Sequence, residues 1–197
     1  MPALTPDAPR GLTWFPTAFS SEESAAHLAG LIDEIPWEQH SFTIFGRTVP
    51  MPRQIQMYGP HGYHYSGVHH LPRPLSPRLL DILERVESLT GRRFNSVLAN
   101  WYRDGADSMG WHTDDDYPHG GQAMVASVSF GAARRFRFRP RDPEQRKGRA
   151  SFGMTLTDGS LLGIEGAART DWQHALPRTR KVIGSRVNLT FRFMCGP

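Results

Sequence analysis

The stretch "RVNLTFRFM", residues 186–194, alternates between polar and apolar side chains. From residue 186 to residue 193 the even-numbered side chains are polar and the odd-numbered ones are apolar, which predicts a β-strand with two unlike faces. The polar set is Arg186, Asn188, Thr190 and Arg192. An ordinary strand with one solvated face gives this alternation. A pocket for a carboxylate is the other reading, because a guanidinium group makes two parallel charged hydrogen bonds to a carboxylate.

Four further strands are predicted before this stretch. Sixteen prolines and nineteen glycines divide the chain into short pieces, which favours turns and short strands. The other four strands are expected at residues 94–102, 122–131, 134–140 and 159–166.

Two helices are predicted before these strands. The first, residues 20–35, begins with a Ser20 cap and an acidic first turn. The second, residues 76–91, ends at Gly91, and its apolar residues at helical spacing are Leu79, Leu80, Leu83 and Val86. Helices followed by strands predict an α+β domain with a β-sandwich or barrel.

Composition narrows the class of protein. The chain has 197 residues, which suits one domain, and no apolar run is long enough to cross a bilayer. The N-terminus lacks the pattern of a signal peptide. Cys195 is the only cysteine, which excludes an internal disulfide and thiolate-rich zinc sites, so we expect a cytoplasmic protein. The net charge of +4 is as consistent with a basic protein that has no polyanionic partner as with one that binds a polyanion.

The segment "NWYRDGADSMGWHTDDDYPHG", residues 100–120, gathers two histidines and five aspartates. In an extended chain His112 and Asp114 point to the same side, which is two thirds of the facial triad of two histidines and one carboxylate that holds Fe(II). A solvated polar loop is the alternative. His174 is the favoured third ligand, and the less favoured histidines are His61, His64, His69 and His70.

Five segments together resemble the AlkB-type Fe(II)/2-oxoglutarate dioxygenases, in the order of that family's motifs. They are "NWYRDGADSMGWHTDDD", "ASVSFGAARRFRFRP", "GSLLGIEG", "WQHALP" and "RVNLTFR". The resemblance covers roughly residues 37–194. It implies one domain over residues 1–197, with N-terminal helices, a nucleotide-recognition lid at 37–70 and a double-stranded β-helix (jelly-roll) core at 95–194.

The resemblance also implies a set of site residues. The iron ligands are His112, Asp114 and His174. The residues around 2-oxoglutarate are Asn100, Tyr102, Arg186, Asn188 and Arg192, of which Arg186 is expected to grip the distal carboxylate with Tyr102. Arg192 is expected beside the end that chelates iron, and Arg192 and Asp116 are assigned to catalysis.

Substrate contacts are implied for Phe45, Arg53, Tyr63, Tyr65 and Asp116. Phe45 falls where duplex-acting members carry an aromatic finger, and a flat apolar side chain can fill the gap left by a flipped base. A core phenylalanine in an ordinary hairpin is the alternative. Arg53 could equally be a surface charge and Asp116 a solvated turn carboxylate. Tyr65 is expected to stack on the damaged base.

The most basic segment is "GAARRFRFRPRDPEQRKGR", residues 131–149. Alternation places Phe136 and Phe138 toward the core and turns Arg135, Arg137 and Arg139 outward. Lys147 and Arg149 are expected to extend this row, which favours contact with phosphates. A charged edge that prevents sheet aggregation is the alternative.

The expected activity is oxidative demethylation of 1-methyladenine and 3-methylcytosine in DNA, with release of formaldehyde. It would use Fe(II), the cosubstrate 2-oxoglutarate and O2. The expected partner is alkylated DNA, with RNA as an alternative, and the protein is expected to be a monomer with no membrane contact. The alternative functions are a hydroxylase of RNA, protein or a small molecule, and a non-catalytic nucleic-acid-binding protein.

Overall fold

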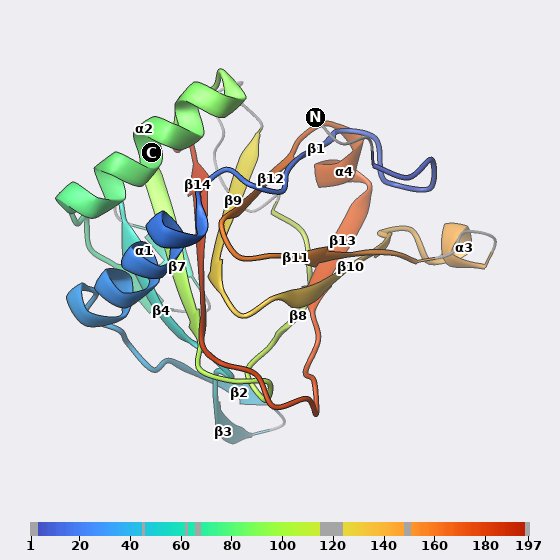
Figure 1. Cartoon of the computed structure of the whole chain (residues 1–197). Coiled ribbons are helices and arrows are strands. Elements are labelled where there is room, and N and C mark those ends of the chain that lie inside the picture. Colours follow the sequence, from blue (N-terminus) through green and yellow to red (C-terminus); the bar gives the residue numbers. More distant parts are fainter. Residues whose placement is uncertain are drawn as a thin grey trace.

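Two antiparallel β-sheets lie face to face in the protein (Figure 1). The structure is a computed structural model, and it describes residues 4–44, 46–61, 63–65, 68–114, 124–147 and 151–195. The larger sheet has six strands, which in spatial order are β1 (Leu12–Phe15), β12 (Ser160–Ile164), β9 (Val125–Gly131), β14 (Arg186–Arg192), β7 (Ser96–Tyr102) and β4 (Gln54–Tyr58).

The second sheet has four strands, in the spatial order β11 (Phe152–Leu156), β10 (Arg134–Pro140), β13 (Trp172–Leu176) and β8 (Met109–His112). Two hairpins complete the described strands. They are β2 (Ser41–Ile44) with β3 (Arg47–Pro50), and β5 (Tyr63–Tyr65) with β6 (Val68–His70). Two antiparallel sheets packed in this way confirm the expected jelly-roll core. The larger sheet also takes β1 and β4 from outside the range 95–194.

Two long helices cover the side of the six-stranded sheet that faces away from the four-stranded sheet (Figure 1). They are α1 (Ser21–Glu34) and α2 (Pro77–Thr90); α3 (Pro143–Arg146) and α4 (Ala167–Thr170) are single turns. No helix in the described ranges is both long and apolar enough to cross a membrane.

Both long helices begin and end as their sequences predict. The Ser20 hydroxyl accepts a hydrogen bond from the Glu23 amide, and the Glu23 carboxylate accepts one from the Ser20 amide, which is a complete capping box. The Ser76 hydroxyl caps α2 by accepting a hydrogen bond from the Leu79 amide, and Gly91 ends the helix with a φ of 66°, a left-handed conformation that glycine adopts without strain.

The strand β14 lies in the middle of the larger sheet, between β9 and β7, and all of its residues are buried. Its apolar side chains Val187, Leu189 and Phe191 join one hydrophobic cluster with Leu31 of α1 and Leu79 of α2. Its polar side chains face the four-stranded sheet, across a second cluster that contains Phe136 and Phe138. The alternation is therefore confirmed, but neither face of the strand is solvated.

The apolar face predicted for α2 is wrong at one position. Leu80 is 52% exposed, whereas Ile82 is fully buried with Leu79 and Val86. Successive helical residues are about 100° apart, so residues 79, 82 and 86 form one stripe and residue 80 lies beside it.

This difference generates a prediction about stability. Replacing Ile82 with alanine should lower the free energy of unfolding by about 2–5 kcal/mol, because it opens a cavity in the core. Leu80→Ala, the matched control, should change it by less than about 0.5 kcal/mol. Urea denaturation followed by circular dichroism measures both values, and similar losses in the two variants would contradict this placement of α2.

Candidate functional site

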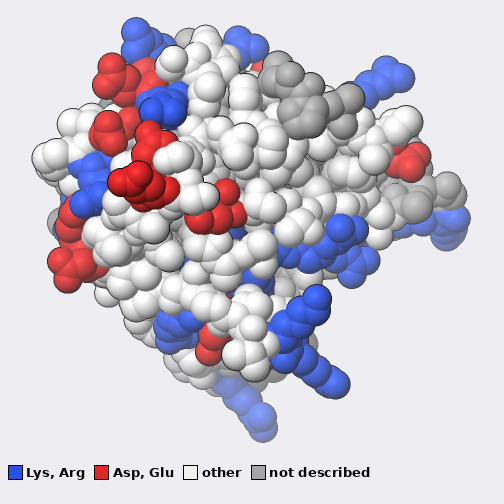
Figure 2. All heavy atoms as spheres, in the orientation of Figure 1, with Lys and Arg blue, Asp and Glu red and all other residues white. Residues whose placement is uncertain are grey.

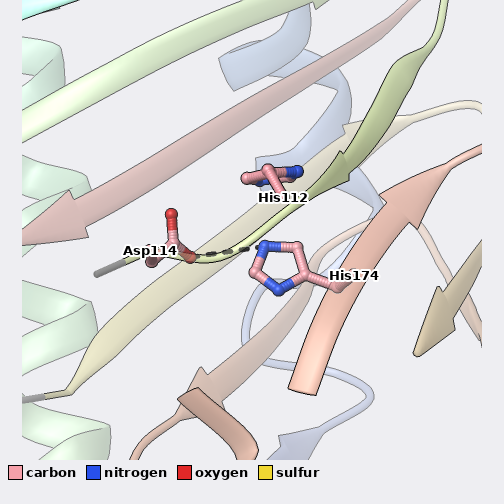
Figure 3. Close-up of side chains that lie close together, drawn as sticks. All are labelled: His112, Asp114 and His174. Atoms are coloured by element: carbon pink, nitrogen blue, oxygen red, sulfur yellow. Dashed lines mark ion pairs between the residues drawn. The ribbon is translucent and has the colours of Figure 1, made fainter. Parts of the chain in front are cut away.

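Three side chains meet between the two sheets in the arrangement of a metal site (Figure 3). His112 ends β8, and His174 lies opposite it in the antiparallel register with β13. Asp114 follows two residues after His112, just beyond the end of the strand. One potential ligand atom from each of the three lies within 4.8 Å of the others. The structure therefore joins the HxD segment to His174, which is some sixty residues further along the chain.

The two histidines are held in defined positions. His112 Nδ1 lies 2.9 Å from the carbonyl oxygen of Gly110, and since a carbonyl can only accept, Nδ1 carries the proton and Nε2 is left for a metal. His174 packs against Phe136, with a ring-centroid distance of 5.2 Å, and its Nε2 lies 3.4 Å from Asp114 Oδ2. Burial, and then the nearby His174, lowers the pKa of His112 to about 4, so this imidazole is neutral near pH 7.

Asp114 is a buried carboxylate with a cationic neighbour. Its Oδ1 accepts a hydrogen bond of 2.6 Å from Arg192 of β14, and both side chains are almost fully buried. Burial alone would raise the pKa of Asp114, but Arg192 and then His174 lower it well below its usual range. The carboxylate is therefore ionised near neutral pH, the form that binds a cation.

One pocket contains these three residues and the polar face of β14. Of the residues expected around a cosubstrate, Asn100, Tyr102, Arg186, Asn188 and Arg192 all line it. Its other lining residues are Leu98, Met109, Val125, Ser127, Phe136, Ile164, Leu176 and Thr190. The pocket thus has one polar wall, made by β7 and β14, and a largely apolar remainder.

Arg186 is a buried cation without an acidic partner. It is 2% exposed, and one guanidinium nitrogen donates to Ser129 Oγ at 2.9 Å. Its guanidinium carbon lies 5.2 Å from the centre of the Tyr102 ring. Its Nε has no hydrogen-bond partner, and no carboxylate within the described ranges pairs with it. Burial lowers the pKa of Arg186 to about 10, which still leaves it charged near neutral pH.

Two serines support this polar wall and were missed in the sequence. Ser129 accepts from Arg186, and Ser127 Oγ accepts from Asn188 Nδ2 at 2.9 Å. Both lie on β9, where "VASVSFG" places serine at two alternate positions, 127 and 129, of an otherwise apolar strand. That alternation is the signal that could have found them.

Arg134 is a third residue that the sequence analysis did not single out. It is buried, and it donates to the carbonyl oxygens of Asp104, Asp107 and Pro177. Its guanidinium carbon lies 5.9 Å from the Tyr102 ring centre. It therefore ties the turn between β7 and β8 to the segment after β13, next to the pocket.

Arg53 is neither a surface charge nor part of the pocket wall. It is buried, and its Nε donates to Asn100 Oδ1 at 2.9 Å. Phe45 and Asp116 lie outside the described residues, as do the side chains of Tyr63 and Tyr65, whose backbone forms β5. Their roles as substrate contacts stay predictions.

The basic strand β10 alternates as expected. Phe136 and Phe138 are buried between the sheets, whereas Arg135 and Arg137 are exposed and Arg139 is partly exposed. Lys147 is paired with Glu144 at 2.9 Å, so it adds little net charge to the row. Arg149 lies outside the described residues.

Comparisons with known proteins agree with this site. A family model described as "2OG-Fe(II) oxygenase superfamily" matches residues 11–192. Alpha-ketoglutarate-dependent dioxygenase alkB homolog 3 of Rattus norvegicus is 37% identical over 195 residues, which are 96% of this chain and 66% of that protein. DNA oxidative demethylase ALKBH2 of Homo sapiens is 42% identical over 156 residues, which are 76% of this chain and 59% of that protein. The chain thus spans less than two thirds of the length of each of these relatives.

A solved structure supports the fold. The structure of OsALKBH1 superimposes with a TM-score of 0.68 at 16% sequence identity, and the match covers 97% of this chain and 100% of that chain.

The pKa of His112 generates a prediction for the metal-free protein. The pKa of His112 is about 6.5 in the unfolded protein and about 4 in the folded protein, so below pH 6.5 the unfolded state binds more protons. The free energy of unfolding therefore decreases as the pH is lowered. Between pH 7 and pH 5 this residue should account for a loss of about 2 kcal/mol.

His112→Gln should remove that part of the pH dependence. Urea denaturation at both pH values measures it. His27, whose pKa is also lowered by burial, remains in the variant as the internal reference. Equal losses in the parent and the variant would contradict a neutral His112 in the folded protein.

Proposed function

The chain belongs to the 2OG-Fe(II) oxygenase superfamily, and from this membership we propose that it oxidatively demethylates N-alkylated bases in DNA. The proposed substrates are 1-methyladenine and 3-methylcytosine, and the products are the unmodified base and formaldehyde. One observation carries the proposal. A pocket combines three metal-ligating side chains with a buried arginine that pairs with no carboxylate of the described residues, in a chain 42% identical to human DNA oxidative demethylase ALKBH2.

The residues present fit Fe(II). Two imidazoles and one carboxylate are the facial donor set of non-haem iron oxygenases, and that set leaves positions open for other ligands. In this proposal His112, Asp114 and His174 hold the iron. The neutral imidazole of His112 and the ionised carboxylate of Asp114 are already in their metal-binding forms.

The pocket also fits 2-oxoglutarate, which carries a carboxylate at each end. A buried guanidinium with an unused Nε requires an anionic partner, because an isolated charge is costly to bury. We assign the distal carboxylate to Arg186, with Tyr102 beside it. Arg192, which already contacts Asp114, lies at the metal end of the same strand face. Asn100 and Asn188, opposite each other on β7 and β14, lie between these two ends.

Fe(II), when bound with 2-oxoglutarate and O2, supplies the oxidation of an N-methyl group to a hydroxymethyl group that is lost as formaldehyde. The chain's own residues bind and orient. Arg192 keeps Asp114 ionised, Gly110 fixes the tautomer of His112, and Arg53 fixes the Asn100 amide. The apolar lining from Val125, Phe136 and Ile164 limits the water that reaches the reacting atoms.

The proposed substrates have a physical rationale. Methylation at N1 of adenine or N3 of cytosine gives a cationic base that pairs poorly, which lowers the cost of flipping it. Aromatic and acidic side chains favour binding of a cation, and we propose that Tyr65 and Asp116 bind the cationic base in this way. Residues 37–70, which contain the β2–β3 and β5–β6 hairpins, are proposed as the lid over the base, in a protein that we place in the cytoplasm.

The charge distribution supports a polyanionic partner. Asp and Glu gather over the side that carries α1 and α2, whereas the right-hand and lower edges of the molecule carry mainly Lys and Arg (Figure 2). The exposed Arg178, Arg180 and Lys181, between β13 and β14, add a basic segment that the sequence analysis did not identify. A one-sided positive surface attracts phosphates at long range.

The proposed reaction predicts a direct measurement. With Fe(II), 2-oxoglutarate and O2, the protein should release formaldehyde and restore the base in an oligonucleotide that contains 1-methyladenine or 3-methylcytosine. His174→Ala and Asp114→Ala should each lower this rate by more than about 100-fold, because each removes a metal ligand.

Mass spectrometry of the oligonucleotide and a formaldehyde assay check both results, and Leu80→Ala, an exposed change on α2, should keep the parental rate. Consumption of 2-oxoglutarate without repair of any methylated oligonucleotide, single-stranded or paired, would instead identify a hydroxylase of another substrate. Nucleic-acid binding without any turnover would identify a binding protein.

The role of Arg186 predicts a change in cosubstrate use. Arg186→Lys keeps the charge but loses the planar guanidinium group that makes two parallel hydrogen bonds to a carboxylate. The KM for 2-oxoglutarate should rise by roughly 10- to 100-fold, since hydrogen bonds to charged groups contribute about 1.5–3 kcal/mol.

Arg93→Lys, at a largely exposed arginine paired with Glu87, is the matched control and should keep the parental KM. Initial rates against 2-oxoglutarate concentration provide the measurement, and thermal unfolding with and without 2-oxoglutarate separates weak binding from misfolding. A parental KM in Arg186→Lys would exclude this residue as the carboxylate anchor.

A further inference from the structure

A group of arginines lies on the outer face of the four-stranded sheet, on the side opposite the pocket. Successive residues of β10 alternate between the two faces, so Phe138 is buried beside His174 while Arg137 and Arg139 point away from it. Arg146 of α3 reaches the same face, because it shares a partner with Arg139. Arg137, Arg139 and Arg146 are called the outer arginine cluster below.

Neighbouring side chains hold two members of the cluster in place. The guanidinium carbon of Arg139 lies 4.3 Å from the centre of the Trp111 ring, and its Nε donates to Gln173 Oε1 at 2.9 Å. Arg146 Nη2 donates to the same oxygen at 3.2 Å, and its other bonds go to the backbone carbonyls of Pro140 and Arg141. Stacking and hydrogen bonding thus fix two cations side by side before any anion arrives.

The third member, Arg137, is less constrained. Its guanidinium carbon lies 5.8 Å from the Trp111 ring centre, and it donates to Ser151 Oγ at 3.3 Å.

Acidic side chains in the described part of the protein leave the positive charge of the cluster unpaired. No carboxylate in the described part of the chain forms an ion pair with any of its three members, whereas Arg78 and Arg85 on the helical side pair with Glu34 and Glu23. Burial, and then the nearby charge of Arg146, lowers the pKa of Arg139. Cations held together without a counter-ion favour an anion with several charges.

The cluster lies directly behind the metal ligands. Trp111 and His112 are consecutive on β8, and Gln173 and His174 are consecutive on β13, so each pair presents one residue to each face of the sheet. β8 is an edge strand, which no further strand of the described chain covers. A polymer with one unit in the pocket can therefore pass around this edge to reach the outer face.

We propose that the outer arginine cluster binds the phosphodiester backbone of the nucleic acid several nucleotides away from the base in the pocket. Trp111 and Gln173 act as positioning residues that hold Arg139. The identity of the polymer rests on the proposed function. Because the pocket and the cluster lie on opposite faces of one sheet, a very short oligonucleotide cannot occupy both, and only a longer one gains affinity from the cluster.

Fluorescence anisotropy tests this without turnover. Protein loaded anaerobically with Fe(II), without 2-oxoglutarate, is titrated with an unmodified single-stranded 20-mer and with a trinucleotide at several salt concentrations. The Arg137→Ala/Arg139→Ala double variant should bind the 20-mer on the order of 10-fold more weakly. Its slope of log K against log salt should fall by about 1.4, since each phosphate contact of a single strand contributes about 0.7.

Three further variants locate the effect. Arg139→Lys should keep the parental salt slope while losing affinity, because the charge stays and the stacked fork is lost. Trp111→Leu should weaken binding of the 20-mer for the same reason. Arg85→Ala removes one charge from an arginine that also lies over an aromatic ring, Phe19, on the helical side, and it should bind both oligonucleotides as the parent does.

The inference is overturned if the double variant binds the 20-mer with parental affinity and slope, if it loses as much affinity for the trinucleotide, or if Arg85→Ala loses as much. It fails separately from the proposed function. Parental repair of methylated DNA with no effect of the double variant rejects only the cluster. Loss of 20-mer binding in the double variant, in a protein that repairs nothing, rejects only the demethylase.

Discussion

The central constraint of this structure is the row of buried polar side chains on one face of β14. β14 is hydrogen-bonded to β9 and β7 and covered on both faces, so Arg186, Asn188 and Arg192 cannot reach bulk water. Buried polar groups require partners, and buried charges require opposite charges. Ser127 and Ser129 satisfy part of this demand and Asp114 satisfies another part. The guanidinium group of Arg186 still lacks an anionic partner among the described residues, and this unmet demand is what lets the pocket bind a carboxylate. The metal ligands and the apolar lining are arranged around that row.

The sequence predicted the elements whose signals are local. The caps at Ser20 and Ser76, the terminal Gly91 and the strict alternation of β14 each depend on a few neighbouring residues, and each was found. The convergence of His112 with His174 depends on the pairing of β8 with β13, which no periodicity encodes. The sequence favoured His174 only because its rivals lie in a segment rich in glycine and proline, and the family resemblance then implied the same residue.

Other features lay beyond the sequence for identifiable reasons. Leu80 was placed in the core because several apolar residues of this helix fit a helical spacing, and the sequence does not show which of them face the sheet. Only the packing of the helix shows that Ile82 is buried and Leu80 is exposed. The serines of β9 matter through their partners on β14, and Arg134 through three carbonyl groups from two separate loops. Arg53 could have been a surface charge on sequence grounds, and only its hydrogen bond to Asn100 shows why it is buried. In each case the deciding contact joins residues far apart in the chain.

The ion pair between Arg192 and Asp114 has a consequence for how the protein matures. Many small metalloproteins fold only when the ion arrives, because their ligands would otherwise repel one another or remain in water. Here a guanidinium group already neutralises the ligand carboxylate, and extensive hydrophobic packing surrounds it. The polypeptide can therefore reach its native shape first and acquire its ion afterwards. A chelator should then yield a folded apoprotein that can bind iron again. When iron is scarce, the protein should accumulate in this folded, inactive form and should not be degraded.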